Sequence, residues 1–356
     1  MAGEDSAKRK RPLGLKARAA KKATTDDGAA PAVNDFEEST ATIMLQGDEN
    51  SDELDELEGI FTSAIECADE DPQRAISLLR GTIHESDRLL RISDVDDRQM
   101  DARFYLIYGS ALYSLTEVSE DDDTLTFLEL AHQRLSQADA LCMAGGEAEA
   151  VVFGRVRLAL AKVELAMLAA DESRDMPLES LDRAVQALQL ASPAADVDAA
   201  DTEQREGPLA VVSLVLSLVD SQRVGDSAAA ELASWCETQA RKLPGDKAKH
   251  ALAQALWLRA NALIDCSELG PEIRELFREA QALLADADAS DVLILRGEIE
   301  LNMGNVQEEE EDQERCYAMA VATFKRVQAM GALPDSFAQF VDEIGPADDD
   351  DDSDEE

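Results

Sequence analysis

Apolar residues recur every three or four positions along most of this chain, and this spacing is the period of an amphipathic α-helix. The first such stretch follows Ser51 and Asp52, whose side chains can cap a helix. A second begins at Asp71-Pro72, and a third runs from Phe104 to Leu115. Runs rich in Val, Ile, Thr and aromatic residues, which would indicate strands, are short or missing. The pattern predicts an all-α protein.

A weak internal repeat with the pattern A-x-x-x-L/F-x-x-A runs through the helical part of the chain. Its copies are Ala131/Leu135/Ala138, Ala184/Leu188/Ala191, Ala280/Leu284/Ala287 and Ala320/Phe324/Val327. Each copy follows a helical stretch that pairs a large apolar residue with a small one, such as Tyr105 with Gly109 or Leu293 with Gly297. In a helical hairpin the small residue permits close approach of the helices and the large residue fills the gap, as in tetratricopeptide-type repeats.

The repeat departs from the standard motif in its spacing. The copies lie farther apart than the roughly 34 residues of a tetratricopeptide repeat. An acidic insertion at residues 307–313 also lengthens the last interval. We therefore predict a degenerate tetratricopeptide-like or helical-repeat solenoid, and a generic helical bundle rich in Ala and Leu is the alternative.

Both ends of the chain lack a sustained apolar period. Residues 1–50 are first basic and then acidic, and residues 345–356 are almost entirely acidic. Neither end can bury enough apolar surface to offset its chain entropy, so both are predicted to be disordered. Between them, an acidic loop at residues 119–123 is expected to separate a small N-terminal helical domain, 51–118, from a larger helical-repeat domain, 124–344.

Net charge narrows the choice of partners. The formal charge is -43, with 76 acidic and 33 basic residues. Such a surface repels phosphate backbones, so we expect no direct binding of nucleic acid by the folded body. It attracts basic proteins, which leaves an acidic chaperone-like escort for a basic ribosomal or nucleosomal protein as an alternative function. A simply solvated acidic surface explains the same charge.

The five cysteines lie far apart and form no C-x-x-C pair, which favours a reducing compartment. No apolar run reaches the roughly 18 residues that a membrane span needs. The basic N-terminus is not followed by the apolar stretch of a secretory signal. We expect a soluble intracellular protein with no membrane partner.

Motifs for catalysis or metal binding are missing from the sequence. His84, His132 and His250 lie in separate helical stretches, and none has a second His or Cys three or four residues away. There is no glycine-rich nucleotide loop and no G-x-S-x-G elbow. We predict a non-enzymatic protein that needs no cofactor.

Two basic clusters near the N-terminus fit a bipartite nuclear-import signal. They consist of Lys8, Arg9, Lys10, Arg11, Lys21 and Lys22. An extended basic segment of this kind can bind acidic grooves on an import receptor. An arm that binds RNA or the protein's own acidic surface is the alternative.

Ser353 precedes Asp354, Glu355 and Glu356, which is typical of a site for an acidophilic kinase. Phosphorylation there would add further negative charge to the acidic tail.

Five segments of the chain resemble a known family. They are Lys10–Lys16, Asp52–Phe61, His84–Arg91, Leu295–Asn305 and Pro334–Phe337. In these segments the chain resembles the fungal enhancer-of-translation-termination family, which includes the negative regulator of a prolyl-hydroxylase-type oxygenase. The acidic tail looks like an addition to the family pattern.

The resemblance implies a nuclear, all-helical protein with two linked roles. One role is to promote correct translation termination together with termination-associated factors. The other is to bind an iron- and 2-oxoglutarate-dependent oxygenase as an import adaptor and inhibitor. The oxygenase would hold the iron and the 2-oxoglutarate, so the resemblance implies no cofactor in this chain.

The segment from His84 to Arg91 has two interpretations. As a partner-binding face it would use His84, Glu85, Asp87, Arg88 and Arg91. As an ordinary amphipathic helix it would pair Glu85 with Arg88 and Asp87 with Arg91.

Overall fold

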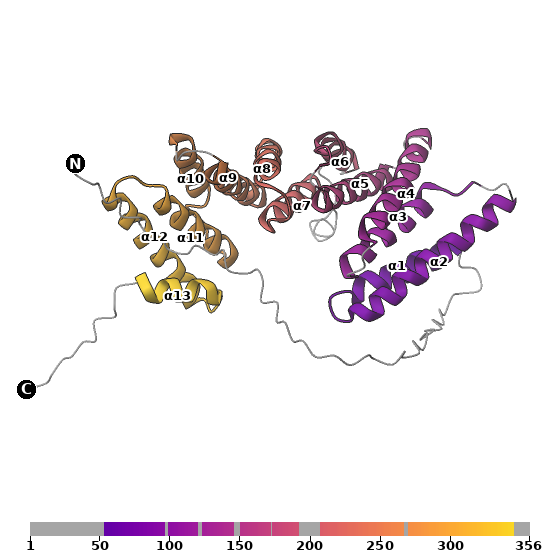
Figure 1. Ribbon diagram of the computed structural model, residues 1–356, viewed down its shortest axis with the longest axis horizontal. Helices are drawn as coiled ribbons and strands as arrows, with labels where there is room; N and C mark the ends of the chain where they lie inside the picture. The colour runs from indigo at the N-terminus through magenta and orange to yellow at the C-terminus, as the bar shows by residue number, and fades with distance from the viewer. Residues whose placement is uncertain are drawn as a thin grey trace, which may run out of the picture. The chain divides into compact units, whose positions relative to one another are not determined.

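Thirteen α-helices and no strands make up the described part of the chain, which we analysed in a computed structural model (Figure 1). The described residues are 53–96, 99–119, 123–145, 150–171, 173–191, 207–266 and 270–344. All of them belong to one unit, residues 45–356. The all-α prediction is confirmed.

The helices follow one another along the chain. Their bounds are α1 (Glu53–Cys67), α2 (Pro72–Asp96), α3 (Ala102–Val118), α4 (Thr124–Gly145), α5 (Ala150–Ala170), α6 (Leu178–Ala191), α7 (Pro208–Asp220), α8 (Asp226–Ala240), α9 (Asp246–Cys266), α10 (Pro271–Leu283), α11 (Ser290–Asn305), α12 (Glu310–Ala329) and α13 (Asp335–Ile344).

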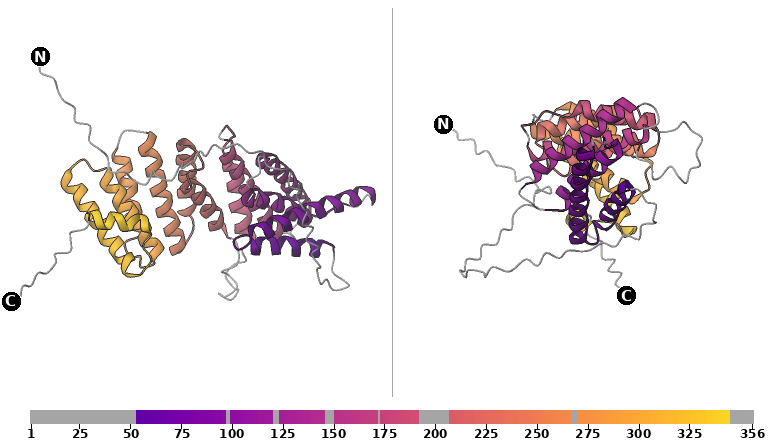
Figure 2. Two further views of the ribbon diagram at one scale, coloured as in Figure 1. Left: turned by 60° about the horizontal axis from the view of Figure 1, so that its bottom comes forward. Right: turned by 90° about the vertical axis from the view of Figure 1, so that its right-hand side faces the viewer.

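Consecutive helices pack as hairpins, and the hairpins stack in chain order (Figure 2). From α1 to α11, each odd-numbered helix also contacts the next odd-numbered helix. Within the described residues, no two even-numbered helices share a comparable contact. The odd-numbered helices therefore form one layer and the even-numbered helices a second, outer layer. This two-layer stacking of hairpins is the predicted helical-repeat solenoid.

The A-x-x-x-L/F-x-x-A copies all lie on even-numbered helices or at their ends. Their described side chains are buried, except for Ala287, which is partly buried. Two further helices use the same register with other residues. These buried positions are Ala75, Leu79 and Thr82 on α2, and Ala229, Ala233 and Cys236 on α8. Thr and Cys in the last position, and Ala in the middle position of α8, conceal these two copies in the sequence.

Two glycines allow the close helix approach that the repeat predicts. A Cβ atom at Gly109 of α3 would lie 2.6 Å from Cγ of Leu135 on α4. A Cβ atom at Gly297 of α11 would lie 2.5 Å from Cε1 of Phe324 on α12. Both separations are far below van der Waals contact, so the small–large pairing is confirmed at both ends of the stack.

Acidic residues define several helix starts. The backbone N–H of Arg74 donates to Oδ1 of Asp71, 3.1 Å away, at the start of α2. Asp101 caps α3 through the N–H of Phe104 at 2.9 Å. The acidic insertion at residues 307–313 lies mostly in the first turn of α12, where carboxylates stabilise the positive end of the helix dipole. It therefore extends a helix rather than a loop.

The apolar core continues across residues 119–123. One cluster joins Leu57 of α1, Leu112 of α3, Leu128 of α4 and Leu160 of α5. A larger cluster extends from α5 to α12 and includes several fully buried Val, Leu and Ile side chains. The division into domains 51–118 and 124–344 stays a prediction.

Candidate interaction surfaces

The predicted partner-binding residues lie on α2, where only some of them are exposed. His84 and Arg91 are exposed, and Glu85 and Arg88 are partly buried. Arg88 Nη2 lies 2.6 Å from Oε1 of Glu85, as the i,i+3 spacing predicts, and 3.5 Å from a carboxylate oxygen of Glu53 on α1. The hydrogen bond with Glu85 raises the pKa of Arg88. The contact of Arg88 with Glu53 joins α2 to α1.

The predicted Asp87–Arg91 ion pair is wrong. The Tyr108 hydroxyl of α3 donates to Oδ1 of Asp87 at 2.5 Å, so the carboxylate points toward α3. Arg91 Nε instead donates to the backbone carbonyl of Asp87 at 3.1 Å. The Arg134 guanidinium lies 5.0 Å from the centre of the Tyr108 ring and ties α4 to the same contact. Of the five predicted residues, Asp87 and Arg88 therefore each contact a neighbouring helix.

The other predicted sites lie outside the described residues. They are the import-signal residues Lys8, Arg9, Lys10, Arg11, Lys21 and Lys22, and the phosphorylation site Ser353. Each stays a prediction.

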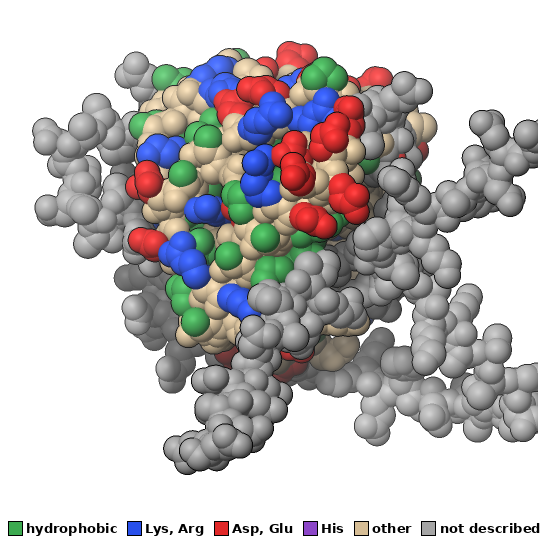
Figure 3. Space-filling view, turned by 90° about the vertical axis from the view of Figure 1, so that its left-hand side faces the viewer, with side chains coloured by type: hydrophobic (Ala, Val, Ile, Leu, Met, Phe, Trp, Pro, Cys, Tyr) green, Lys and Arg blue, Asp and Glu red, His purple; other side chains and the backbone are tan. Residues whose placement is uncertain are grey.

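Charged side chains of both signs are mixed on the face at the α12 and α13 end, as Figure 3 shows. Arg326 pairs with Asp288 at 3.0 Å, and Arg315 pairs with Asp312 at 2.6 Å. Exposed pairs of this kind contribute about 0–1 kcal/mol each. This face carries alternating charges rather than a continuous basic patch.

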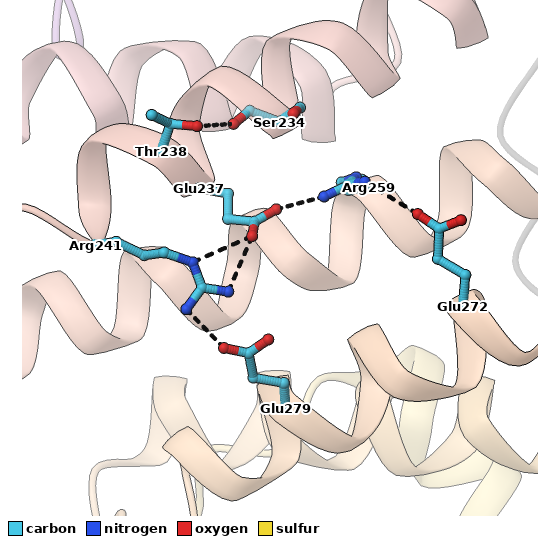
Figure 4. Close-up of polar contacts among 7 residues, drawn as sticks. All are labelled: Ser234, Glu237, Thr238, Arg241, Arg259, Glu272 and Glu279. Atoms are coloured by element: carbon cyan, nitrogen blue, oxygen red, sulfur yellow. Dashed lines mark hydrogen bonds and ion pairs between the residues drawn. The ribbon is translucent and has the colours of Figure 1, made fainter.

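A charged network joins α8, α9 and α10 around Glu237 (Figure 4). The Glu237 carboxylate accepts from Arg241 at 2.9 Å and from Arg259 of α9 at 2.7 Å. The two arginines continue to α10, where Arg241 pairs with Glu279 at 2.7 Å and Arg259 with Glu272 at 3.1 Å. Burial alone would raise the pKa of Glu237, but the hydrogen bonds from Arg259 and Arg241 outweigh it and lower the pKa.

A second carboxylate is fully buried between α10, α11 and α12. Glu300 accepts hydrogen bonds from Arg296 Nε at 3.0 Å, from Gln281 Nε2 at 3.2 Å and from the Thr323 hydroxyl at 2.7 Å. Because its oxygens have donors on three helices, this buried charge is compensated and fixes the helices relative to one another.

A third set of residues lies on the odd-numbered helices α7, α9 and α11, and its polar side chains have no such partners within the described residues. We call it the α7–α9–α11 face. On α9 its residues are partly buried and follow one another at intervals of four, three, four and three positions, so they form one stripe along the helix. The stripe lies on the side of α9 opposite to Arg259. The face consists of Ser213, Ser217 and Asp220 on α7, His250, Gln254, Trp257, Asn261 and Ile264 on α9, and Glu298 on α11.

Two carboxylates of this face have raised pKa values. Burial of Glu298, together with the nearby charge of Asp220, raises the pKa of Glu298 to about 7. Burial also raises the pKa of Asp220. Sequence reasoning missed this pair because Asp220 and Glu298 come together only through packing. The heptad spacing of Gln254, Trp257 and Asn261 in an Ala-rich helix is the signal that could have indicated the face.

Within the described ranges, no three His, Cys, Asp or Glu side chains come close enough to hold a metal ion. A hollow of about 250 Å³ is lined by Leu168 and residues 224–228, whose side chains are mostly small or apolar. No described helix is long and apolar enough to cross a membrane.

Comparison with known proteins assigns the family. A family model described as "Nuclear pore complex subunit Nro1" matches residues 6–234, well over half of the chain. The chain belongs to the Nro1 family. The family predicted from sequence resemblance is confirmed, and the description of the Nro1 family confirms the predicted nuclear localisation.

The individual proteins that the chain resembles are distant in sequence. The chain is 31% identical over 157 residues to "Enhancer of translation termination 1" of Meyerozyma guilliermondii. That alignment covers 44% of this chain and 36% of the relative, so the chain spans about a third of that relative's length.

Solved structures of Schizosaccharomyces pombe Nro1, titled as a nuclear import adaptor, are 20% identical to this chain. One covers 82% of this chain and 98% of its own with a TM-score of 0.46. Another covers 85% and 99% with a TM-score of 0.48. A further structure, with a TM-score of 0.46 and coverage of 82% and 93%, is titled "The hypoxic regulator of sterol synthesis Nro1 is a nuclear import adaptor".

Proposed function

We propose that this chain is a non-enzymatic adaptor that brings a partner protein into the nucleus. The match of the Nro1 family to residues 6–234 carries the proposal, because it includes the basic N-terminal segment, helices α1 to α7 and part of α8. Stacked helical hairpins present long continuous surfaces, which suit the binding of other proteins. Lys8 to Arg11 and Lys21-Lys22 would bind an import receptor, and the helical body would hold the cargo.

The cargo in this proposal is a 2-oxoglutarate-dependent, prolyl-hydroxylase-type oxygenase, which the adaptor also inhibits. The sequence resemblance in His84–Arg91 and Leu295–Asn305 supports this choice. The oxygenase supplies its own iron and 2-oxoglutarate, so this chain contributes binding surface and an import signal.

A linked role in translation termination is part of the proposal. It is supported by the Meyerozyma guilliermondii relative, whose name is "Enhancer of translation termination 1". Removal of this chain is expected to increase stop-codon readthrough in a dual-reporter assay. Unchanged readthrough would contradict this role and leave the import role standing.

The import role is tested by following the chain and a tagged oxygenase of this class in cells. Replacement of Lys8–Arg11 and Lys21-Lys22 by Ala should move both proteins to the cytoplasm, because the receptor then lacks its basic ligand. Lys16→Ala/Arg18→Ala is the matched control, since it removes basic residues between the two clusters, and both proteins should stay nuclear. An oxygenase that accumulates in the nucleus without this chain would contradict the adaptor role.

A further inference from the structure

Helix α13 departs from the pattern of the other odd-numbered helices. From α1 to α11, each odd-numbered helix contacts the next one, whereas α13 contacts α12 and makes no comparable contact with α11 among the described helices. It is also the shortest described helix, with ten residues, and Figure 1 shows it lying across the hairpin of α11 and α12. A helix of this length is marginal in water by itself, so the surface beneath it holds it in place.

The surface under α13 is apolar and belongs to both helices of the last hairpin. Phe337 and Val341 of α13 are buried in one cluster with this surface. We call it the end surface, and it consists of Ile294 and Leu301 on α11 and of Ala320, Val321 and Phe324 on α12. The side of α13 that carries Asp335 and Ser336 is exposed and polar. The helix is therefore amphipathic, and its apolar side is held by the end surface.

Phe324 is the aromatic anchor of the end surface. It lies against Gly297 of α11, where a Cβ atom would be 2.5 Å from Cε1 of the ring. The ring of Phe337 stacks on Phe324, with centres 4.6 Å apart and planes 16° apart, and Phe340 meets Phe324 edge-on at 6.0 Å. Such aromatic contacts depend on geometry, so the end surface selects side chains at positions i, i+3 and i+4 of a helix, as in Phe337, Phe340 and Val341.

The end of α12 is complete without α13. The backbone N–H of Gly331, whose φ is 71°, donates to the carbonyl of Gln328 at 2.9 Å. The N–H of Ala332 donates to the carbonyl of Val327 at 3.2 Å. This pair of bonds is the Schellman motif, which satisfies the last carbonyls of a helix within the helix itself. Departure of α13 would therefore expose the end surface and leave the hydrogen bonds of α12 intact.

We propose that the end surface is a docking site for an amphipathic helix of a partner protein, and that α13 is the internal occupant which this helix replaces. The partner helix carries aromatic residues at positions i and i+3 and a β-branched residue at i+4. These side chains take the places of Phe337, Phe340 and Val341. An extended segment or a nucleic acid does not reproduce that spacing, so a helix is the occupant. The inference goes beyond the import role and does not depend on it.

Hydrogen exchange of the full chain, followed by mass spectrometry, tests whether α13 opens by itself. Backbone amides of α13 should exchange about tenfold or more faster than those of α11 and α12, because only α13 leaves the stack. The probe is a synthetic helix of Ala, Glu and Lys that carries only the Phe-x-x-Phe-Val spacing. A large excess of probe should speed the exchange of α13 further, since the end surface is then occupied. Exchange of α13 as slow as that of α11 and α12, with and without probe, would overturn the proposal.

An opened variant measures the affinity of the end surface for the probe. Phe337→Ser/Val341→Ser removes the apolar contacts of α13 and leaves the end surface unchanged. Fluorescein-labelled probe should bind this variant about tenfold or more tightly than the parent chain, because the parent α13 competes from within the same molecule. Ser336→Ala, on the exposed side of α13, is the matched control and should keep the affinity of the parent chain. A probe with Ser in place of both Phe residues should bind neither chain.

Further measurements on the opened variant decide where the probe binds and what α13 is. Adding Ile294→Ala/Leu301→Ala should weaken probe binding about tenfold, because the α11 half of the end surface is then lost. Binding that survives this change lies elsewhere and overturns the site. If the opened variant loses the helical circular dichroism of the whole stack, α13 is an integral part of the fold and the proposal is overturned. A dimer that excludes the probe would show that a second copy is the occupant, which overturns the partner helix.

Discussion

Glu237 and Glu298 are both glutamates in the same stack of helices, yet their surroundings shift their pKa values in opposite directions. Glu237 is surrounded by Arg241 and Arg259, which lower its pKa. Glu298 has burial and Asp220 around it, which raise its pKa to about 7. The first site is electrostatically complete and holds three helices together. Glu298 has no arginine or lysine partner within the described residues, so burial and the charge of Asp220 decide its pKa.

The largest expected loss of stability follows from replacing Glu300, which is fully buried and has hydrogen-bond donors on three helices. Glu300→Ala leaves Arg296, Gln281 and Thr323 without their acceptor, and should reduce the free energy of unfolding by about 3–5 kcal/mol. Urea denaturation followed by circular dichroism measures this loss. Glu314→Ala on the exposed side of α12 is the control and should change stability by less than about 0.5 kcal/mol. Equal stability of the two variants would contradict a structural role for Glu300.

A smaller loss is expected in the network of Figure 4. Glu237→Ala removes the acceptor that Arg241 and Arg259 share, and should cost about 1–3 kcal/mol in the same assay. Glu272→Ala removes only an exposed outer partner of Arg259 and should cost less than about 1 kcal/mol. A reversed order would show that the outer contacts, not the central carboxylate, hold α8 to α10.

At Glu298 the expected effect is a dependence of stability on pH. Glu298 has a folded pKa of about 7, above its ordinary value of 4.5, so the folded state binds more protons than the unfolded state between these two values. Its contribution to stability is present at low pH and is lost as pH rises through 7. Glu298→Gln should therefore flatten the dependence of the melting temperature between pH 5 and 8 and raise that temperature at pH 8. A variant as pH-sensitive as the parent chain would contradict this assignment.

The smallest effects on stability are expected on α2, where Asp87 contacts α3 and where Arg91 and His84 are exposed. Asp87→Ala should cost about 1 kcal/mol because Tyr108 loses its acceptor. Arg91→Ala and His84→Ala affect exposed side chains and should each stay within about 0.5 kcal/mol. Thermal denaturation of the three variants provides the ranking. If Arg91→Ala lowered stability as much as Asp87→Ala, the result would favour an Asp87–Arg91 ion pair and contradict the contacts described above.

Local sequence was sufficient for much of the fold. Helical spacing and capping by Asp71 depend on neighbours along the chain. The pairing of Gly109 with Leu135 and of Gly297 with Phe324 joins consecutive helices, and the repeat pattern indicates it because each pair recurs at the same place in a hairpin. The copies on α2 and α8 were missed because Thr82, Ala233 and Cys236 fill repeat positions with atypical residues. Any small side chain suits such a position, so packing tolerates what a sequence pattern does not.

The interaction surfaces were harder to predict for a different reason. The i,i+3 pair of Glu85 and Arg88 follows from helix geometry alone and is present. Asp87 was assigned to the wrong partner because Tyr108 lies on the next helix. The proximity of Asp220 and Glu298 depends on how α7, α9 and α11 stack. Periodicity indicates which face a residue occupies, whereas stacking decides what that face meets.

The layering of the helices also has a mechanical consequence. Neighbouring hairpins are joined through the odd-numbered helices, and the described even-numbered helices do not brace one another. Small rotations at successive hairpin junctions can then add up along the stack, as in a spring whose coils touch on one side. Pulling on the two ends of such a stack would extend it by many small steps before any single helix unravels. A cargo bound on the odd-numbered side would clamp several coils at once and make the spring stiffer.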